Sequence, residues 1–203
     1  MVKKAKRAKQ ALEKAHRLDR VLGQRALAFR AHPLIQVLGK LSEVGDQPPL
    51  IALSTATIVA GAAVRSPGVA RTGARMLASH LLATGIKTLI KHSIDRTRPK
   101  AAREQGYKLE KGGKHGPELA SFPSGHTAGA VAVARAVRHD YPGQAPLANA
   151  AAVAIGVIQL PRGKHYLSDV LVGAIIGVAA EAAVDRLARL ATEQWRSRTR
   201  AML

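Results

Sequence analysis

Apolar residues gather in stretches that alternate with charged or breaker-rich segments. Residues 48–64 run without a charge, and residues 145–161 do the same further along the chain. Residues 75–91, 127–137 and 170–184 are apolar stretches interrupted by isolated polar or charged side chains. No segment of useful length alternates between apolar and polar residues, as a half-buried strand would. The pattern therefore predicts an all-α chain with about five apolar helices.

The two uncharged stretches approach the length of a membrane span. A helix crosses the hydrocarbon core with about 17–25 apolar residues, and residues 48–64 fit that range best. Because alanine favours insertion less than leucine or isoleucine does, a soluble helical bundle is the alternative. We expect a multi-pass membrane bundle.

Basic residues crowd both ends of the chain. Ten of the first thirty residues are Lys or Arg. Apolar residues among them partly follow a helical period, so residues 1–32 are predicted to form a basic amphipathic arm on an anionic membrane surface. A solvated helix without a specific contact is the alternative. Residues 33–190 are expected to form the helical bundle, and residues 191–203 a basic tail.

Composition restricts the chemistry further. The 203 residues carry 32 Lys and Arg against 13 Asp and Glu, a net charge of +19 that favours an anionic partner. The absence of cysteine excludes disulfides, thiolate metal sites and thiol catalysis. The scattered acidic residues offer no carboxylate cluster for magnesium. A basic nucleic-acid-binding helical protein is one alternative, although the low aromatic content of 3% argues against base stacking.

Three polar clusters lie at the ends of the apolar stretches. In the first, Lys91 and Arg98 are seven residues apart, so a continuing helix would place both on one side. Arginine binds two phosphate oxygens with its fork, and lysine adds a compact charge. The alternative is a basic helix end that complements the helix dipole.

The second cluster, Pro-Ser-Gly-His, immediately precedes an apolar stretch. Ser124 is suited to cap a helix, and the backbone N–H groups of Gly125 and His126 would then point at a bound anion. Simple capping with His126 on the surface is the alternative.

The third cluster contains His165 and Asp169, which are four residues apart. On a helix the carboxylate would meet one ring nitrogen and leave the other free. Such a histidine is a nucleophile or a base, although the pair is also compatible with a mere polar contact.

Together and in this order, the clusters resemble the type 2 phosphatidic acid phosphatase family, whose superfamily also contains bacterial acid phosphatases and vanadium haloperoxidases. The matching motifs, from residue 91 to about residue 184, are Lys-x6-Arg-Pro, Pro-Ser-Gly-His and His-x3-Asp. The resemblance implies a phosphatase that needs no metal or cofactor. We expect its substrate to be a lipid phosphate or isoprenoid diphosphate, and its location the inner or plasma membrane of a bacterium.

The resemblance also implies roles for individual residues. His165 would attack phosphorus and form a phosphohistidine, Asp169 would orient it, and His126 would protonate the leaving oxygen. The oxygens of the phosphoryl group would be bound by basic side chains and helix amides: Lys91, Arg98, Ser124 and Gly125.

One position departs from the family pattern. Six residues before His165 the family has an arginine that binds phosphate, and this chain has Gln159. Arg162 is three residues further on and is a candidate to bind the same oxygens. A catalytically weak or inactive family member that only binds anionic lipid is therefore a further alternative.

Overall fold

The structure, a computed structural model, describes residues 2–113 and 116–201, which are mostly helical. The elements, in chain order, are α1 (Val2–Leu27), α2 (Pro33–Leu41), the 3-10 turn η1 (Ser42–Gly45), α3 (Gln47–Ala63), α4 (Pro67–Ser93), β1 (Ile94–Arg96), α5 (Pro99–Gln105), β2 (Leu109–Lys111), α6 (Gly125–Asp140), the 3-10 turn η2 (Pro142–Gln144), α7 (Ala145–Val157) and α8 (Leu167–Ala201). The predicted all-α class with about five apolar helices is confirmed.

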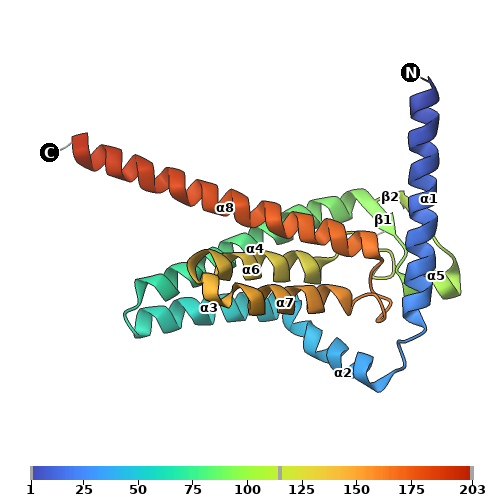
Figure 1. Cartoon of the computed structure of the whole chain (residues 1–203), viewed down its shortest axis with the longest axis horizontal. Helices are drawn as coiled ribbons and strands as arrows, with labels where there is room; N and C mark the ends of the chain where they lie inside the picture. Colours follow the sequence, from blue (N-terminus) through green and yellow to red (C-terminus); the bar gives the residue numbers. More distant parts are fainter. Residues whose placement is uncertain (1, 114–115, 202–203) are drawn as a thin grey trace.

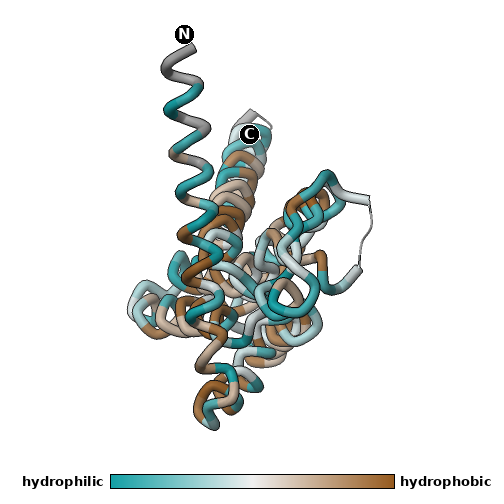
Figure 2. The backbone as a smooth tube through the Cα atoms, turned by 90° about the vertical axis from the view of Figure 1, so that its right-hand side faces the viewer, coloured by the Kyte–Doolittle hydropathy of each residue, from teal (hydrophilic) through white to brown (hydrophobic). Residues whose placement is uncertain are grey.

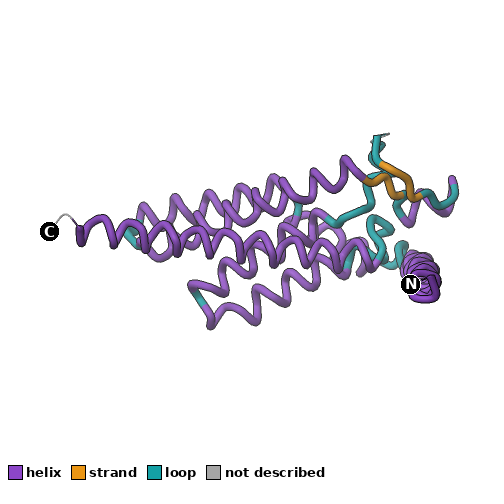
Figure 3. Tube along the Cα trace, turned by 90° about the horizontal axis from the view of Figure 1, so that it is seen from above, coloured by secondary structure: helices purple, strands orange, loops and turns teal. Residues whose placement is uncertain are grey.

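The five apolar helices α3, α4, α6, α7 and α8 run along the long axis of the molecule (Figure 1). Helix α6 packs against α4, α7 and α8, and α3 packs against α4. The strands β1 and β2, helix α5 and the loops that lead into α6 and α8 gather at one end of this bundle (Figure 3). All three polar clusters predicted from the sequence therefore lie near one end.

Small residues bring α6 and α8 into close contact. Gly173 and Gly177 are four residues apart on α8 and face α6. A Cβ atom on Gly173 would lie 2.6 Å from the carbonyl oxygen of Ser124, and one on Gly177 would lie 2.6 Å from that of Ala128. Because no side chain fits there, the first turn of α6 is held directly against the start of α8.

Large apolar side chains, in contrast, point away from the bundle. The core between α4, α6 and α8 is built mainly from buried alanines. Exposed leucine, valine and isoleucine side chains cover the outer faces of α3, α4, α7 and α8: Leu53, Val59, Leu81, Leu89, Leu147, Val153, Leu171 and Ile175. A small-residue interior with a large apolar exterior is typical of helices packed in lipid. By length and composition, one helix of the described chain, Leu167–Thr199, is suited to cross a membrane, and Gln47–Ala63 is a shorter apolar helix.

The pattern of apolar stretches does not reveal two features of the structure. The polar segment 91–121 contains α5 and an antiparallel pair of strands, β1 and β2. Strands of three residues are too short to show an alternation of apolar and polar residues in the sequence. The apolar stretch 170–184 and the basic C-terminal segment form one helix, because no glycine or proline interrupts residues 178–201.

Helix α1 crosses the loop end of the bundle at a steep angle and extends beyond it (Figures 1 and 2). It contacts α5 and α8 through a stripe of buried residues, Asp19, Gly23 and Leu27. Leu18, Leu22 and several basic residues remain exposed. The second half of α1 is therefore docked on the bundle by specific contacts within the chain.

Candidate active site

A short backbone ladder joins the first cluster to the second. The N–H of Arg96 donates to the carbonyl of Leu119 at 2.7 Å, and the N–H of Ser121 donates back to Arg96 at 3.1 Å. The N–H of Arg98 donates to the carbonyl of Glu118 at 2.8 Å. The segment after α4 therefore lies alongside the segment that leads into α6.

Lys91 and Arg98 reach this region from different elements. Because α4 ends at Ser93, the expectation that a continuing helix aligns the two side chains is wrong. Lys91 Nζ donates to the carbonyl of Ala120 at 2.7 Å, and Arg98 is the residue that precedes α5. The β1 strand between them, rather than helical periodicity, returns Arg98 to the neighbourhood of Lys91.

Ser121 connects the second cluster to the third with two hydrogen bonds. Its carbonyl oxygen lies 2.6 Å from Nδ1 of His165, and its hydroxyl donates to Oδ2 of Asp169 at 2.6 Å. Since a carbonyl only accepts, we infer that Nδ1 of His165 carries the proton. The other ring nitrogen, Nε2, then holds a free lone pair.

His165 is buried, with 3% of its surface exposed. Burial, together with the positive charges of Lys91 and Arg98, lowers the pKa of His165 to about 4, against the opposing effect of Asp169. The imidazole is therefore neutral near pH 7, which is the form that a nucleophile requires.

Asp169 does not make the direct hydrogen bond to His165 that its spacing suggested. Its Oδ2 lies 3.8 Å from Nδ1 of His165. The carboxylate is completely buried and accepts hydrogen bonds from Arg96 at 2.5 Å, from the Ser121 hydroxyl at 2.6 Å and from the N–H of Tyr166 at 2.8 Å. These donors occupy the carboxylate, while the Ser121 carbonyl accepts the hydrogen bond from Nδ1 of His165.

The predicted N-cap of α6 is confirmed. The hydroxyl of Ser124 accepts a hydrogen bond from the N–H of Thr127 at 3.4 Å. The N–H groups of Gly125 and His126 precede the first intrahelical hydrogen bonds, so they remain suited to bind an anion.

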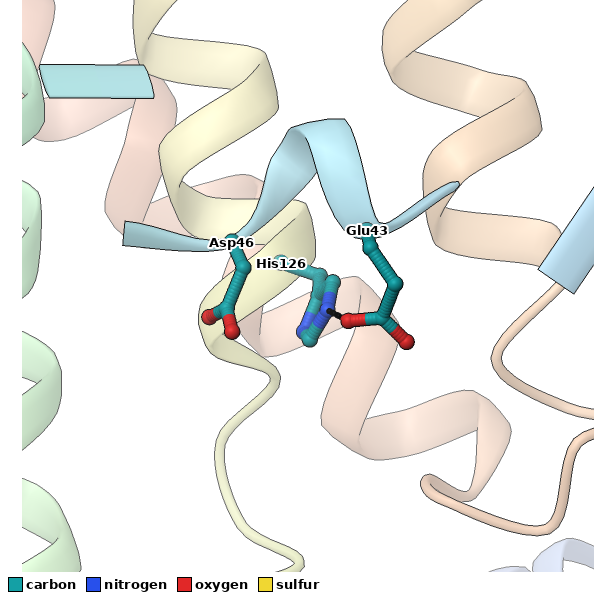
Figure 4. Close-up of side chains that lie close together, drawn as sticks. All are labelled: Glu43, Asp46 and His126. Carbon is teal, nitrogen blue, oxygen red and sulfur yellow. Dashed lines mark hydrogen bonds and ion pairs between the residues drawn. The ribbon is translucent and has the colours of Figure 1, made fainter. Parts of the chain in front are cut away.

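Glu43, in η1, contacts the side chains of one histidine and two basic residues. Its Oε2 lies 3.3 Å from Nε2 of His126 (Figure 4). Its Oε1 accepts from Lys164 at 2.9 Å and also from Arg162. Although burial raises the pKa of Glu43, hydrogen bonds from Arg162, Lys164 and His126 lower it to about 2. An ionised carboxylate therefore holds the side chain of the predicted general acid.

Glu43, Asp46 and His126 are also spaced for metal binding, with ligand atoms within 4.8 Å of one another (Figure 4). A cation there would meet the charges of Lys164 and Arg162, which already occupy Glu43. The surroundings of Glu43 are thus unfavourable for a metal ion.

Gln159 and Arg162 meet at the same hydroxyl group. The Gln159 side chain is buried and donates to Ser42 Oγ at 3.2 Å, and Arg162 donates to the same oxygen at 2.9 Å. Gly163, with a φ of 69°, allows the turn after Arg162 to fold back tightly. The guanidinium of Arg162 consequently lies beside the side chain at the position where the family has its arginine.

A cavity of about 400 Å³ adjoins the turn before His165. Among its lining residues, the basic ones are Arg30, Arg98, Lys100, Arg162 and Lys164, and the acidic ones are Glu104 and Glu118. The excess of basic side chains favours an anionic ligand.

Sequence reasoning missed three residues that organise this region: Glu43, Arg96 and Asp19. Arg96 lies inside the Lys-x6-Arg motif, which was a usable signal. Glu43 and Asp19 lie far from every motif, and only the fold brings them to the site.

Comparisons with known proteins identify the family and the fold. The sequence model of the PAP2 superfamily matches residues 72–192, more than half of the chain. No curated protein sequence matches the chain.

Two solved structures share the fold. One is described as the first transmembrane PAP2 type phosphatidylglycerolphosphate phosphatase from Bacillus subtilis, with a TM-score of 0.62 and 22% identity over 88% of this chain and 87% of that one. The other is Aquifex aeolicus LpxE, with a TM-score of 0.57 and 21% identity over 81% and 93%. The family match and the shared fold establish that this chain belongs to the PAP2 superfamily.

Proposed function

We propose that this protein is a membrane phosphatase that transfers a phosphoryl group from a lipid phosphate or isoprenoid diphosphate to His165, and then to water. The observation that carries the proposal is the neutral, buried His165, whose Nδ1 is held by the Ser121 carbonyl and whose Nε2 keeps its lone pair. The family membership supports the same reaction class.

In the first step, Nε2 of His165 attacks phosphorus and the bond to the leaving oxygen breaks. The leaving oxygen takes the bonding electrons and a proton from His126. Positive charge from Lys91, Arg98 and Arg162 and the N–H groups of Gly125 and His126 stabilise the phosphoryl oxygens. In the second step His126 removes a proton from water, the water oxygen attacks phosphorus, and the P–N bond breaks to restore neutral His165.

Asp169 acts here mainly through Ser121. The carboxylate fixes the Ser121 hydroxyl at 2.6 Å, and the carbonyl of the same residue holds His165. At 3.8 Å the negative charge also stabilises the imidazolium character that develops when His165 is phosphorylated.

The substrate class is inferred from where the site lies. Outward-facing apolar side chains surround the bundle, and the basic helix α1 crosses its loop end, where the site is located (Figure 1). A phosphate site at that end would meet lipid headgroups at the surface of a multi-pass protein, which we place in the inner or plasma membrane of a bacterium.

Membrane residence has a direct biochemical consequence. After cell lysis the protein should sediment with membranes and stay there in alkaline carbonate, because apolar helices in lipid are not released by breaking charge contacts. Immunoblots of the pellet and supernatant measure this. Recovery of most of the protein in the carbonate supernatant would contradict a spanning bundle.

The enzymatic proposal is tested with detergent-purified protein and a panel of lipid phosphates and isoprenoid diphosphates. We expect phosphate release from at least one of them, at rates that EDTA leaves unchanged, because side chains and amides supply all the electrostatic stabilisation in this mechanism. Binding to anionic vesicles without any turnover would instead support the inactive, lipid-binding alternative. Activity that EDTA abolishes would contradict the mechanism.

A further inference from the structure

Helix α1 is anchored at the active-site end by a buried carboxylate. Asp19, only 8% exposed, accepts hydrogen bonds from Arg96 at 2.7 Å, from the N–H of Ser168 at 3.0 Å and from its hydroxyl at 2.5 Å. Both carboxylate oxygens are therefore used, and all their partners belong to elements next to His165. A charged group buried in this way is specific to one geometry.

Arg96 bridges Asp19 and Asp169. Its Nη2 donates to Asp19, while Nη1 donates to Asp169 at 2.5 Å and to the Ser168 hydroxyl at 2.7 Å. The guanidinium is planar and rigid, so fixing one end of the fork fixes the direction of the other. Asp19 and Asp169 are thus held by opposite sides of one side chain.

Close packing of α1 supports the same contact. A Cβ atom on Gly23 would lie 2.7 Å from the ring of Tyr166, and Arg96 lies 4.2 Å above the centre of that ring. Gln24 donates to the carbonyl of Pro99 at 3.0 Å. The helix therefore packs directly on the residue that follows His165.

We propose that Asp19 is a positioning residue for phosphoryl transfer: it orients Arg96, which fixes Asp169 and, through the Ser121 hydroxyl and carbonyl, the ring of His165. The inference rests on the proposed function of His165. It makes the N-terminal arm a part of the active site, although the arm lies outside the matched family segment of residues 72–192.

The expected effect falls on the chemical step. Asp19→Asn leaves one end of the buried Arg96 fork without a charged partner, so the guanidinium loses its fixed direction. Misplacing a reacting group by about 1 Å can cost on the order of a hundredfold in rate, so we expect kcat to fall by about 10- to 100-fold. KM should change less than about twofold, because Lys91 and Arg98 still bind the phosphate.

The experiment compares full-length variants in detergent. Asp19→Glu, which keeps the charge, should recover part of the lost kcat. Arg96→Lys should lower kcat as Asp19→Asn does, because lysine lacks the rigid planar fork whose two nitrogens reach Asp19 and Asp169. Glu181→Gln is the matched control, since it removes another buried carboxylate, 2.9 Å from Arg135, within the bundle. It should lower thermal stability and leave kcat unchanged. Equal kcat in Asp19→Asn and this control would overturn the proposal.

A second readout does not depend on activity. Hydrogen exchange followed by mass spectrometry should show faster exchange in residues 118–124 and 164–170 of Asp19→Asn, and unchanged exchange there in Glu181→Gln. Unchanged exchange in Asp19→Asn overturns the positioning role even if the enzyme is active. Faster exchange in a protein that hydrolyses none of the panel would uphold the coupling and refute the proposed function.

Discussion

Replacing His165 by alanine should reduce phosphate release by several orders of magnitude, the largest effect of any single substitution in this site. The variant lacks the nitrogen that forms the covalent intermediate, so only substrate binding and electrostatic stabilisation remain. Steady-state phosphate release from the best substrate of the panel measures the loss. The effect should appear in kcat, since Lys91 and Arg98 still bind substrate.

His139→Ala provides the matched control. His139 is the only other histidine on α6 besides His126 and lies at the opposite end of that helix, where it pairs with Asp185 at 2.8 Å. Its removal should leave turnover unchanged. An active His165→Ala protein would contradict the nucleophile assignment.

Because the pKa of His165 is lowered to about 4, the wild-type rate should also stay insensitive to His165 protonation as the pH falls from 7 to 5.

The second large effect concerns the missing family arginine. Arg162→Ala should slow turnover by about a hundredfold, because losing one charge-assisted donor to the transferring group costs on the order of 3 kcal/mol. Adding Gln159→Arg to that variant should restore much of the rate. The structural reason is that Gln159 and Arg162 both donate to Ser42 Oγ. An arginine side chain at either position would therefore lie beside the same hydroxyl group.

Arg189→Ala is the control for loss of a positive charge. Arg189 is exposed and pairs with Asp185 at 2.8 Å, away from the site. An unchanged rate in Arg162→Ala would mean that Arg162 only holds Glu43 and the turn. In that case Gln159→Arg should raise the activity of the otherwise unaltered protein.

The helices could be predicted where local composition determines them. The predicted stretch 48–64 agrees with α3 (Gln47–Ala63) to within one residue at each end, because this uncharged apolar stretch begins at paired prolines and ends at a turn. Ser124 could be recognised as an N-cap for the same reason, since capping depends on neighbours within three residues. The motifs likewise placed His126, His165 and Asp169 at the ends of apolar stretches.

The contacts between these residues could not be predicted from spacing. His165 and Asp169 are one helical turn apart in sequence. His165 nevertheless lies before α8 begins, and its Nδ1 donates a hydrogen bond to the Ser121 carbonyl. Asp19 meets Arg96 across 77 residues of sequence, and no local pattern encodes that pair. Such long-range ion pairs depend on how α1 docks, which is decided by Gly23 and Tyr166 together.

The covalent intermediate offers the most direct test of the mechanism. Protein mixed with labelled substrate in EDTA, quenched within milliseconds and analysed by mass spectrometry should carry an acid-labile phosphoryl group on His165. The group should disappear as inorganic phosphate is released, and Asp19→Asn should accumulate it more slowly. A phosphoryl group on another residue, or turnover with no phosphoenzyme at any time, would contradict the account.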